Sequence, residues 1–493
     1  MALAESARDG ARHGEVRELL LYIDGRFVDA SSRERTTIIS PATGELVATV
    51  PVPGAAEVHA AVEAARRAQR AWAEVGAFER AALCHRIGDA LATRVDELAH
   101  LQTLEQGKPL AESVADITEA AELFHLHAED MVRLNGETLP VRDPNKRMVT
   151  FRRPVGTWAI ITPWNFPVLM VAEFVAPGLV TGNAHVLKPP ATTCAAVLGA
   201  IAAFEEAGLP PGLVNVLPGD GAVGELLARN EGIDAIGFIG SSATGARLQE
   251  IAGLKRKIME CSGNGPLVVC SDADVERAAR AAVYGASLCA GQVCCATERV
   301  IVDASRRDEF VAACLAEAAR VRLGDPFDPE TTLGPLNNEA VATKMDRHIA
   351  DARAGGARVL CGGGRRQDMA TDLYYELTVL DAVTPEMVVA REESFGPIVP
   401  VLAAAGDDAL LELANADALG LQAAVFTRDL GRAFRFMEHL EVGQVIVNDT
   451  TDYWDINMPF GGAGGRGTGW GRIGGKWTLM DMSDLRTGIL DLS

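Results

Sequence analysis

The chain has 493 residues, of which 48% are hydrophobic and 23% are charged, and its formal net charge is −21. This composition is typical of a globular protein that is long enough to form two or three domains. The acidic excess excludes nucleic acid and anionic membranes as expected partners, because phosphate contacts require a surplus of Lys and Arg.

Other global features predict where the protein works. The sequence contains no run of 18 apolar residues, so we expect no membrane-spanning segment. The first 19 residues alternate charges and lack an apolar stretch, which argues against a secretory signal. Nine cysteines, an odd number, are dispersed along the chain, as is typical of reduced thiols. We therefore expect a cytoplasmic protein.

The amino-terminal part of the chain is predicted to be helical. Apolar residues recur with helical spacing in 57–75 and again in 79–106. A candidate β-hairpin follows at 137–156, with its turn at 143–146. A hairpin alone cannot bury both of its faces, so we expect it to pack on another chain or on the carboxyl tail.

From residue 157 onward, short β-branched runs alternate with helical segments. This alternation is typical of parallel strands buried on both faces, and it predicts a doubly wound α/β domain. A second alternation that starts at residue 266 predicts another α/β domain. The candidate strands are 157–162, 184–188, 213–219, 235–240 and 257–261 in the first domain, and 266–270, 298–302, 357–363, 374–380 and 422–427 in the second.

Three strand ends of the first predicted domain carry groups that suit a phosphate. The segment GSSATG, 240–245, follows a strand and opens a helix, whose first N–H groups favour an anion. Lys188 ends a second strand, and Gly219 and Gly221 follow a third. The G-x-x-x-x-G spacing differs from the dinucleotide fingerprint, so this motif alone also fits a simple capped helix. Together the three strand ends favour a nucleotide site.

Three further residues are candidates for catalysis. The stretch CAGQVCCATER, 289–299, holds three cysteines, but no His accompanies them, so we expect no metal site. Asn165 lies in the rigid loop TPWNFP, where its amide could stabilise an oxyanion or simply form a turn. Glu260 ends a buried strand, where a carboxylate is either ion-paired or has a raised pKa that suits proton transfer.

The order of the motifs carries a family resemblance. PWNFP, LKPP, FIGSSATG, MECSGNGP, GQVC, EESFGP and PFGG follow LYIDGRF, SPATGELVATV and LEQGKPL. In this order they resemble the NAD(P)-dependent aldehyde dehydrogenase superfamily from about residue 20 to residue 480. The resemblance implies two doubly wound α/β domains plus a small β arm that joins subunits into a homodimer or homotetramer. The implied ranges are 1–131 and 153–261 for dinucleotide binding, 262–455 for catalysis, and 132–152 with 476–493 for the arm.

The resemblance also implies a reaction, the oxidation of a small aldehyde to its carboxylic acid. The GQ-x-C cysteine, here Cys294, would attack the aldehyde and form a thiohemiacetal and then a thioester. Asn165 and the Cys294 backbone N–H would stabilise the oxyanion, and Glu260 would activate the water that hydrolyses the thioester. Cys289 and Cys295 would then be packing residues or oxidation-sensitive neighbours.

The implied cofactor is NAD or NADP. Where many NAD-using members have a Glu, this chain has Ala191, so we expect that NADP is tolerated and that Thr192 or Thr193 could receive its 2′-phosphate. The residues implied to contact the cofactor are Ile161, Trp164, Lys188, Gly221, Gly240, Ser241, Glu393 and Phe395.

Two departures from the family's pattern fall near the expected substrate. Glu173 and Phe174 replace a common Trp-Lys pair, and Glu173 could favour a cationic or polyol aldehyde or could form a structural ion pair. The glycine-rich segment 459–475 has two extra residues and lacks the usual lysine. An apolar funnel, or alternatively core packing, is expected for Met170, Tyr453, Trp454 and Phe460.

Two alternative functions remain open at this stage. A dehydrogenase that passes the thioester to coenzyme A tends to lack the hydrolytic glutamate, whereas Glu260 is present here. A catalytically silent structural or binding relative would have lost the nucleophile or its partners, whereas Cys294, Glu260 and Asn165 are all present. Acid formation without added thiol, and titration of one reactive thiol, would distinguish these functions.

Overall fold

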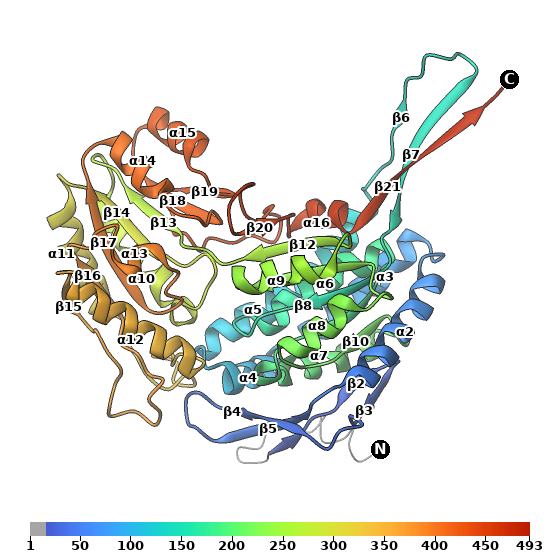
Figure 1. The fold of residues 1–493 in the computed structure, drawn as a ribbon, viewed down its shortest axis with the longest axis horizontal. Coiled ribbons are helices and arrows are strands. Elements are labelled where there is room, and N and C mark those ends of the chain that lie inside the picture. Colours follow the sequence, from blue (N-terminus) through green and yellow to red (C-terminus); the bar gives the residue numbers. More distant parts are fainter. Residues whose placement is uncertain (1–15) are drawn as a thin grey trace.

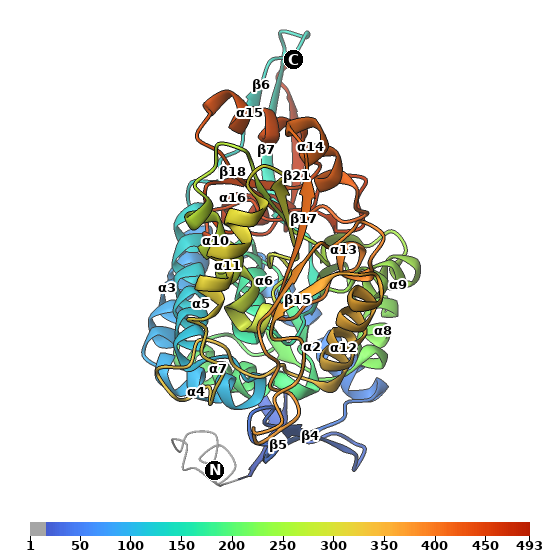
Figure 2. The ribbon, with the colours of Figure 1, turned by 90° about the vertical axis from the view of Figure 1, so that its left-hand side faces the viewer.

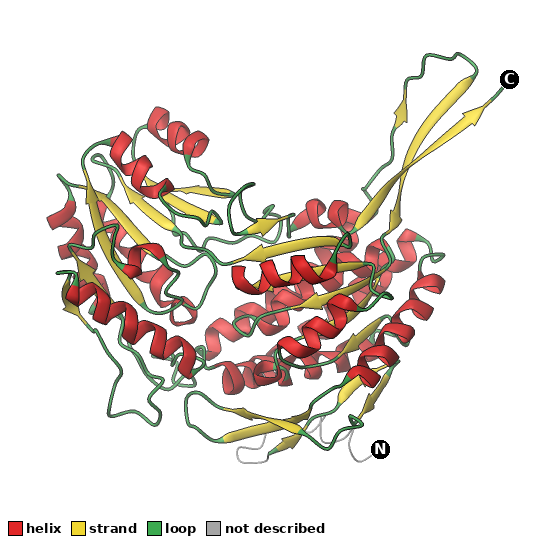
Figure 3. Cartoon of the chain, viewed as in Figure 1, coloured by secondary structure: helices red, strands yellow, loops and turns green. Residues whose placement is uncertain are grey.

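The computed structural model describes residues 16–493, so the prediction about a leader at the amino end falls largely outside the described residues. Two helix-covered bodies are joined side by side, and a β arm projects from one of them (Figure 3). Within the described part of the chain, no helix is both long enough and apolar enough to cross a bilayer.

The first body is built on an eight-stranded sheet with the order β20-β12-β11-β8-β9-β10-β2-β3. Its five middle strands are parallel, and β2, β3 and β20 pair antiparallel at the edges. All five predicted strands are confirmed by this sheet. Its strands are β2 (Leu21–Ile23), β3 (Arg26–Val28), β8 (Thr157–Ile161), β9 (Ala184–Lys188), β10 (Val214–Val216), β11 (Ala235–Gly240), β12 (Arg256–Cys261) and β20 (Gly469–Trp470).

Helices cover both faces of this sheet (Figures 1 and 3). The helix α6 is buried along all of its 15 residues, because it is enclosed by α5 and the sheet. The predicted helix at 79–106 is in fact two helices, α3 and α4, separated at Thr93 and Arg94. The helices of this body are α2 (Ala55–Trp72), α3 (Ala77–Ala92), α4 (Val95–Gln106), α5 (Leu110–Met131), α6 (Pro167–Thr181), α7 (Ala195–Glu206), α8 (Gly221–Arg229), α9 (Ser242–Ala252) and α16 (Gly475–Asp481).

The second body contains a seven-stranded sheet with the order β15-β16-β17-β14-β13-β18-β19. The five predicted strands are present, and the sequence analysis missed β17 and β19. The strands are β13 (Pro266–Val269), β14 (Arg299–Asp303), β15 (Arg358–Cys361), β16 (Thr378–Asp381), β17 (Ile398–Ala404), β18 (Gln422–Phe426) and β19 (Gln444–Val447). The helices are α10 (Val275–Ser287), α11 (Arg307–Ala318), α12 (Glu339–Ala354), α13 (Val388–Arg391), α14 (Asp407–Asn415) and α15 (Leu430–His439).

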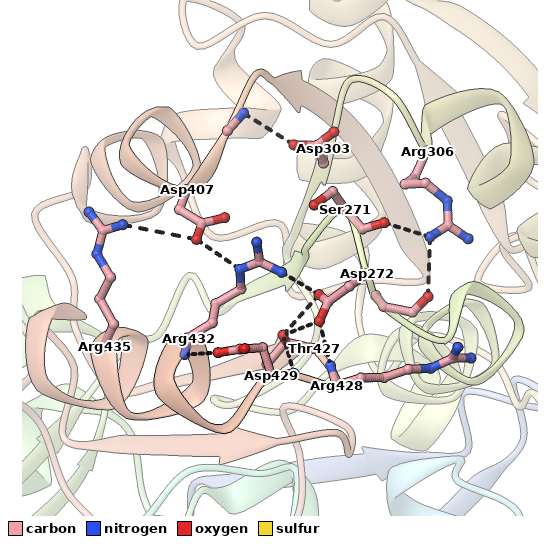
Figure 4. Close-up of polar contacts among 12 residues, drawn as sticks. Ser271, Asp272, Asp303, Arg306, Asp407, Thr427, Arg428, Asp429, Arg432 and Arg435 are labelled. Carbon is pink, nitrogen blue, oxygen red and sulfur yellow. Dashed lines mark hydrogen bonds and ion pairs between the residues drawn. The ribbon is translucent and has the colours of Figure 1, made fainter.

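A polar network in the second body connects α14 and α15 to the loops after two of its strands (Figure 4). The Arg432 guanidinium on α15 binds Asp272 at 2.6 Å and Asp407, at the start of α14, at 2.8 Å. Asp272 also accepts hydrogen bonds from the Thr427 hydroxyl and the Arg428 backbone N–H. These contacts connect the segments that follow β13 and β18 to α14 and α15.

The arm is a three-stranded antiparallel sheet with the order β21-β7-β6. Its strands are β6 (Thr138–Leu139), β7 (Lys146–Pro154) and β21 (Ser483–Asp491). The hairpin therefore packs on the carboxyl tail, as one of the two predicted alternatives, and β21 pairs with β7 along its whole length. The arm and the small sheet of β1 (Arg17–Glu18), β4 (Arg35–Ile39) and β5 (Leu46–Pro51) lie at opposite ends of the molecule (Figures 1 and 2).

Candidate active site

Two cavities of about 360 Å³ and about 510 Å³ meet inside the protein. We call them the first and the second cavity, respectively. They share four lining residues, which are Met170, Ile239, Glu260 and Cys294. A thiol and a carboxyl group are therefore accessible from both sides, so a molecule in either cavity can reach the same pair of reactive groups.

Cys294 lies on a tight loop between α10 and β14. The loop begins in a short 3-10 turn, η2 (Leu288–Gly291), whose backbone has left-handed φ angles of 49° at Cys289, 56° at Ala290 and 72° at Gly291. A Cβ atom at Gly291 would lie 2.2 Å from the Gly396 carbonyl oxygen, so only glycine fits this approach. The chain thus turns sharply just before it presents the Cys294 thiol.

The pKa of the Cys294 thiol is raised well above its ordinary value. The causes, in order, are a hydrogen bond with Cys295, burial, and the nearby Glu260 carboxylate, with which the thiol also shares a hydrogen bond. None of these contributions comes from a cation. The thiol is therefore protonated at rest, and its activation requires a base, which Glu260 is placed to provide.

Glu260 lies near the end of β12, and only 3% of its surface is exposed. Burial raises the pKa of Glu260 to about 8, the charge of Glu393 adds to this shift, and the hydrogen bond with Cys294 opposes it. One carboxyl oxygen, Oε1, has no hydrogen-bond partner. Of the two environments that the sequence allowed for Glu260, the structure has the raised pKa, which suits exchange of a proton near neutral pH.

Asn165 lies on the loop between β8 and α6, and its side chain is almost completely buried. Its Nδ2 atom donates a 2.8 Å hydrogen bond to the carbonyl oxygen of Gln292, two residues before Cys294. A carboxamide has two N–H donors. One of them fixes the side chain beside the Cys294 loop, and the second is left for an oxyanion that forms at Cys294, where the two cavities meet.

The first cavity contains five of the eight predicted cofactor residues, which are Trp164, Gly240, Ser241, Glu393 and Phe395. Ser241 caps the N-terminus of α9 by accepting the N–H of Thr244, so this helix end faces the cavity. The Glu393 carboxylate accepts the N–H of Gly263 at 3.0 Å. A helix N-terminus beside a carboxylate that could receive ribose hydroxyls fits a dinucleotide.

The other three predicted cofactor residues do not line this cavity but lie at neighbouring strand ends. The Lys188 ammonium donates to the Gly219 carbonyl oxygen at 3.3 Å. Burial lowers the pKa of Lys188 to about 8, and the charge of Asp220 opposes this shift. Gly221 is the exposed first residue of α8. Ile161 is buried at the end of β8.

One part of the prediction for the 2′-phosphate is wrong. Thr193 is fully buried, because the chain forms a 3-10 turn, η1 (Ala191–Thr193), that directs it into the protein. Thr192 in the same turn is exposed, and Ala191 is partly exposed. Of the two candidate threonines, only Thr192 can therefore meet a ligand beside Lys188.

Aromatic and apolar side chains form much of the second cavity. The predicted funnel residues Met170, Tyr453, Trp454 and Phe460 all line it. The rings of Trp454 and Phe460 pack edge to face, with centroids 5.1 Å apart. The prediction that Phe174 lies near the substrate is wrong. Phe174 is fully buried outside the cavity, because its ring packs against Gly237 on β11.

Glu173 does line the second cavity, but not in the manner expected from the sequence. Burial raises the pKa of Glu173 well above its ordinary value, and the charges of Glu260 and Glu119 add to the shift. Its Oε2 atom has no partner. The raised pKa favours the protonated form of Glu173. No ion pair with Glu173 is present among the described residues, so the predicted structural ion pair is wrong, whereas its role toward cationic or polyol aldehydes stays a prediction.

The glycine-rich segment 459–475 supports Glu260 from the edge of the sheet. Its strand β20 pairs with β12, with Gly469 opposite Glu260. A Cβ atom at Gly469 would lie 2.3 Å from the Met259 carbonyl oxygen. The segment also closes on itself, because Phe460 and Ile473 exchange backbone hydrogen bonds of 2.8 and 2.9 Å. Glycines in this segment thus allow backbones to approach closely beside the catalytic candidates.

The sequence analysis missed several residues that the structure brings to the cavities. Glu298 accepts the backbone N–H groups of Ser394 and Phe395 at 2.9 and 2.8 Å, and so holds the loop that carries Glu393. In the second cavity, α5 contributes acidic residues at 112, 116 and 119. Their i, i+4, i+7 spacing was the signal that could have identified this helix face.

Comparisons with known proteins agree with this geometry. The model of the aldehyde dehydrogenase family matches residues 27–487. A glutarate-semialdehyde dehydrogenase of Pseudomonas putida is 35% identical over 468 residues, which are 94% of this chain and 96% of the relative. An NADP(+) succinate-semialdehyde dehydrogenase of Escherichia coli is 36% identical over 467 residues, with 94% and 96% coverage. The crystal structure of a succinate-semialdehyde dehydrogenase from Burkholderia pseudomallei is similar with a TM-score of 0.93 and 38% identity, and the match covers 96% of this chain and 98% of that one. The chain therefore belongs to the aldehyde dehydrogenase family, and it is an oxidoreductase that oxidises an aldehyde with NAD or NADP.

Proposed function

We propose that Cys294, Glu260 and Asn165 together oxidise an aldehyde to a carboxylic acid through a covalent thioester. One observation carries this proposal: the Cys294 thiol and the Glu260 carboxyl form the shared wall of the two cavities. The first cavity suits NAD(P), which takes two electrons and the hydrogen of the aldehyde carbon. The second cavity suits the aldehyde. Over one cycle, aldehyde, water and NAD(P)+ become acid, NAD(P)H and a proton.

In the first half of the reaction, the Cys294 sulfur attacks the aldehyde carbon. The ionised form of Glu260 accepts the thiol proton, because the two groups already share a hydrogen bond. The carbonyl oxygen becomes an oxyanion, to which the free N–H of Asn165 donates. Such a preorganised donor typically contributes about 10²–10³ in rate. When the oxyanion collapses, the carbon loses its hydrogen and is left as a thioester of Cys294.

In the second half, Glu260 acts on water. The group must first lose the proton that it received, and with a pKa of about 8 it can do so near neutral pH. The carboxylate then removes a proton from water that attacks the thioester carbon, and the acid leaves as the Cys294 thiol is restored. General-base assistance of this kind contributes about 10²–10⁴ in rate.

The same residues argue against the two alternative functions. A coenzyme A-acylating enzyme does not need a base for water, whereas Glu260 is held between the cavities with one free oxygen. A silent relative does not need an accessible thiol, whereas Cys294 is partly exposed. Of the other eight cysteines, seven are buried and only Cys361 is partly exposed. Hydrolysis by Glu260 is therefore the proposal that accounts for both features.

We propose that the enzyme accepts NADP as well as NAD. At Ala191 there is no carboxylate to repel a 2′-phosphate, and Lys188 and exposed Thr192 lie beside it. The negative charge of Asp220, which lies close enough to act on Lys188, disfavours a 2′-phosphate there. Initial rates with both cofactors test this proposal. A kcat/KM with NADP below a thousandth of that with NAD would show that Ala191 does not make the site tolerant of a 2′-phosphate.

We propose that the arm joins subunits of a cytoplasmic dimer or tetramer. Its β21 strand forms a sheet edge with exposed apolar side chains at Leu485, Ile489 and Leu490, and such an edge favours pairing with another chain. All nine cysteines are free, as is usual in a reducing compartment. Light scattering of the protein with and without residues 483–493 tests the role of the arm. An unchanged mass would contradict it.

The proposed chemistry is tested by the ratio of the products and by removal of the Cys294 thiol. Without added thiol, the wild-type protein should convert aldehyde to acid with one NAD(P)H formed per acid. Cys294→Ala should form neither product, whereas Cys289→Ala should retain oxidation. A Cys294→Ala protein that oxidises aldehyde at the wild-type rate would disprove the role of this thiol.

A further inference from the structure

The second cavity has an unusual distribution of charge. Of the described residues that line it, six are acidic and none is Lys, Arg or His. The six acids are Glu112, Asp116, Glu119, Glu173, Glu260 and Asp452. A semialdehyde, whose far end is a carboxylate, would bring another negative charge to this wall without any cation to receive it.

Three of the six acids already have an assigned role, a strongly raised pKa or a cationic partner. Glu260 is assigned to the chemistry, and the raised pKa of Glu173 favours its protonated form. Asp116 is paired with the buried Lys108 ammonium at 2.5 Å, and that ammonium lies 3.6 Å from the centre of the Phe166 ring. Among the described residues, no ion pair is formed by Glu112, Glu119 or Asp452, although the Lys108 charge also acts on Glu112 and Glu119. The Glu112 carboxylate accepts the backbone N–H of Cys289 at 2.8 Å.

Asp452 is the acid that most clearly lacks a partner. Its side chain is more than nine-tenths buried, with 7% exposed, and it lines the cavity. One oxygen accepts a hydrogen bond from the Thr450 hydroxyl, and the other, Oδ2, has no partner. Buried carboxylate oxygens are rarely left in this state, so an unpaired one in a cavity wall points to a missing ligand.

The pKa values of these acids show that part of their negative charge remains in the cavity at neutral pH. Burial raises the pKa of Asp452 to about 6, and the charge of Asp449 adds to the shift. Asp452 is therefore largely ionised at pH 7. Burial raises the pKa of Glu119 to about 7 and that of Glu112 to about 8, so both can ionise when a cation binds beside them.

The aromatic side chains of the same wall suit the same class of ligand. Tyr284, Tyr453 and Trp454 line the cavity together with the acids. Tyr284 lies close to Asp452, Glu112 and Glu119, since all three charges act on its hydroxyl. A cation over an aromatic face contributes about 0.5–2 kcal/mol. Acids and aromatic faces in one wall therefore form a receptor for an ammonium group.

We infer that the second cavity selects aldehydes that carry a positively charged amino or trimethylammonium group, with Asp452, Glu112 and Glu119 facing the cation. This inference rests on the proposed function, because the aldehyde end must reach Cys294. Arg277 and Arg280 do not oppose it, because they line a separate, more open hollow of about 330 Å³ that shares only Tyr284 and Thr450 with the second cavity.

The test compares three aldehydes of similar length on the full-length protein. They are 4-trimethylammoniobutanal, its neutral isostere 5,5-dimethylhexanal, and the anionic 5-oxopentanoate. We expect kcat/KM for the cation to exceed that for the isostere by about tenfold or more, and kcat/KM for the anion to be the lowest. Equal values for the cation and the isostere, or a preference for the anion, would overturn the inference and leave the proposed function intact. If the protein oxidises none of the three, both the inference and the proposed function fail.

A pair of variants assigns the preference to Asp452. Asp452→Asn should reduce the cation-to-isostere ratio of kcat/KM at least about fivefold, because it removes the buried charge. The control is Asp308→Asn, which removes the same charge from a side chain that is 97% exposed and does not line the cavity. A ratio that Asp308→Asn lowers as much as Asp452→Asn would mean that the general field of the protein, not this cavity, selects the substrate.

A measurement on the wild-type protein keeps the test independent of folding defects in the variants. Butyltrimethylammonium should inhibit oxidation of the neutral aldehyde competitively, and pentanoate should inhibit it at least about tenfold more weakly. Equal inhibition by the two ions would contradict the inference.

Discussion

The Asn165 side chain donates a 2.8 Å hydrogen bond to the Gln292 carbonyl oxygen, and this bond joins the loop after β8 to the loop that carries Cys294. Two segments more than a hundred residues apart in the sequence thus meet at the thiol. The bond also orients the second N–H of the amide, which is the donor proposed for the oxyanion.

Replacing Asn165 by Ala is expected to lower kcat by about 10²–10³, because the oxyanion loses a preorganised donor. Asn165→Asp, which keeps the size of the side chain but removes both N–H donors, should have a similarly low kcat. Stopped-flow measurement of the first turnover checks this prediction. A kcat within threefold of wild type in either variant would contradict the proposed role.

The pH dependence of the reaction should follow Glu260. Its pKa is raised to about 8, so the group is mostly protonated at pH 7 and becomes a carboxylate as the pH rises through about 8. Hydrolysis should therefore speed up over this range. Glu260→Gln should retain a first burst of NAD(P)H, limited by slower thiol activation, and then stall as the thioester, which mass spectrometry of the intact protein detects. Steady turnover by Glu260→Gln at the wild-type rate would exclude Glu260 as the base.

Gly263 is expected to tolerate no side chain. A Cβ atom there would lie 1.9 Å from the Cys294 carbonyl oxygen, so Gly263→Ala must displace the nucleophile loop. Overpacking of this kind costs about 1–3 kcal/mol of stability. We expect lower thermal stability and a strong loss of activity. The control is Gly464→Ala, since a Cβ atom at Gly464 would have no heavy atom within 4 Å.

Glu173→Gln is expected to stabilise the protein at alkaline pH. The pKa of Glu173 is raised, so in the folded state it keeps its proton where the unfolded chain would have lost it. The stability that this provides is fully present below the unfolded pKa and is lost as the pH rises toward the folded pKa. One such group contributes a slope of up to about 1.4 kcal/mol per pH unit. Urea unfolding at pH 6 to 9 should show a shallower decrease for Glu173→Gln than for wild type.

Arg432→Ala is expected to destabilise the second body without changing the active site. It removes the ion pairs of Arg432 with Asp272 and Asp407, and hydrogen bonds to charged groups contribute about 1.5–3 kcal/mol each, with a discount for their partial exposure. Burial alone would raise the pKa of Asp272, but contacts from Thr427, Arg428 and Arg432 lower it. This stabilisation is therefore present at neutral pH and lost in acid. Calorimetry should show a lower Tm at pH 7 and a smaller difference at pH 3. Arg435→Ala is the control, because Arg435 pairs chiefly with the exposed Asp408.

The sequence alone predicted ten strands of the two α/β domains and the candidates for catalysis. Buried β-branched runs predicted the strands that end at Lys188, Gly240 and Glu260, because parallel strands covered on both faces must be continuously apolar. The ordered motifs predicted the family and the residues Cys294 and Asn165. The sequence analysis missed β17, β19 and β20 and the five strands β1 to β5. It also merged α3 with α4, because both have the same helical periodicity.

Only the tertiary structure decided which side chains share a cavity. Phe174 and Thr193 were expected beside ligands but are buried in the core, because their direction depends on helix and turn geometry that periodicity does not specify. The sequence did not reveal the raised pKa of Glu173, since that pKa depends on burial and on neighbouring carboxyl groups from distant segments. Asp452 and the acidic face of α5 became part of one wall only when segments more than 300 residues apart in sequence came together. Local sequence patterns determine secondary structure, but charge and reactivity depend on long-range packing.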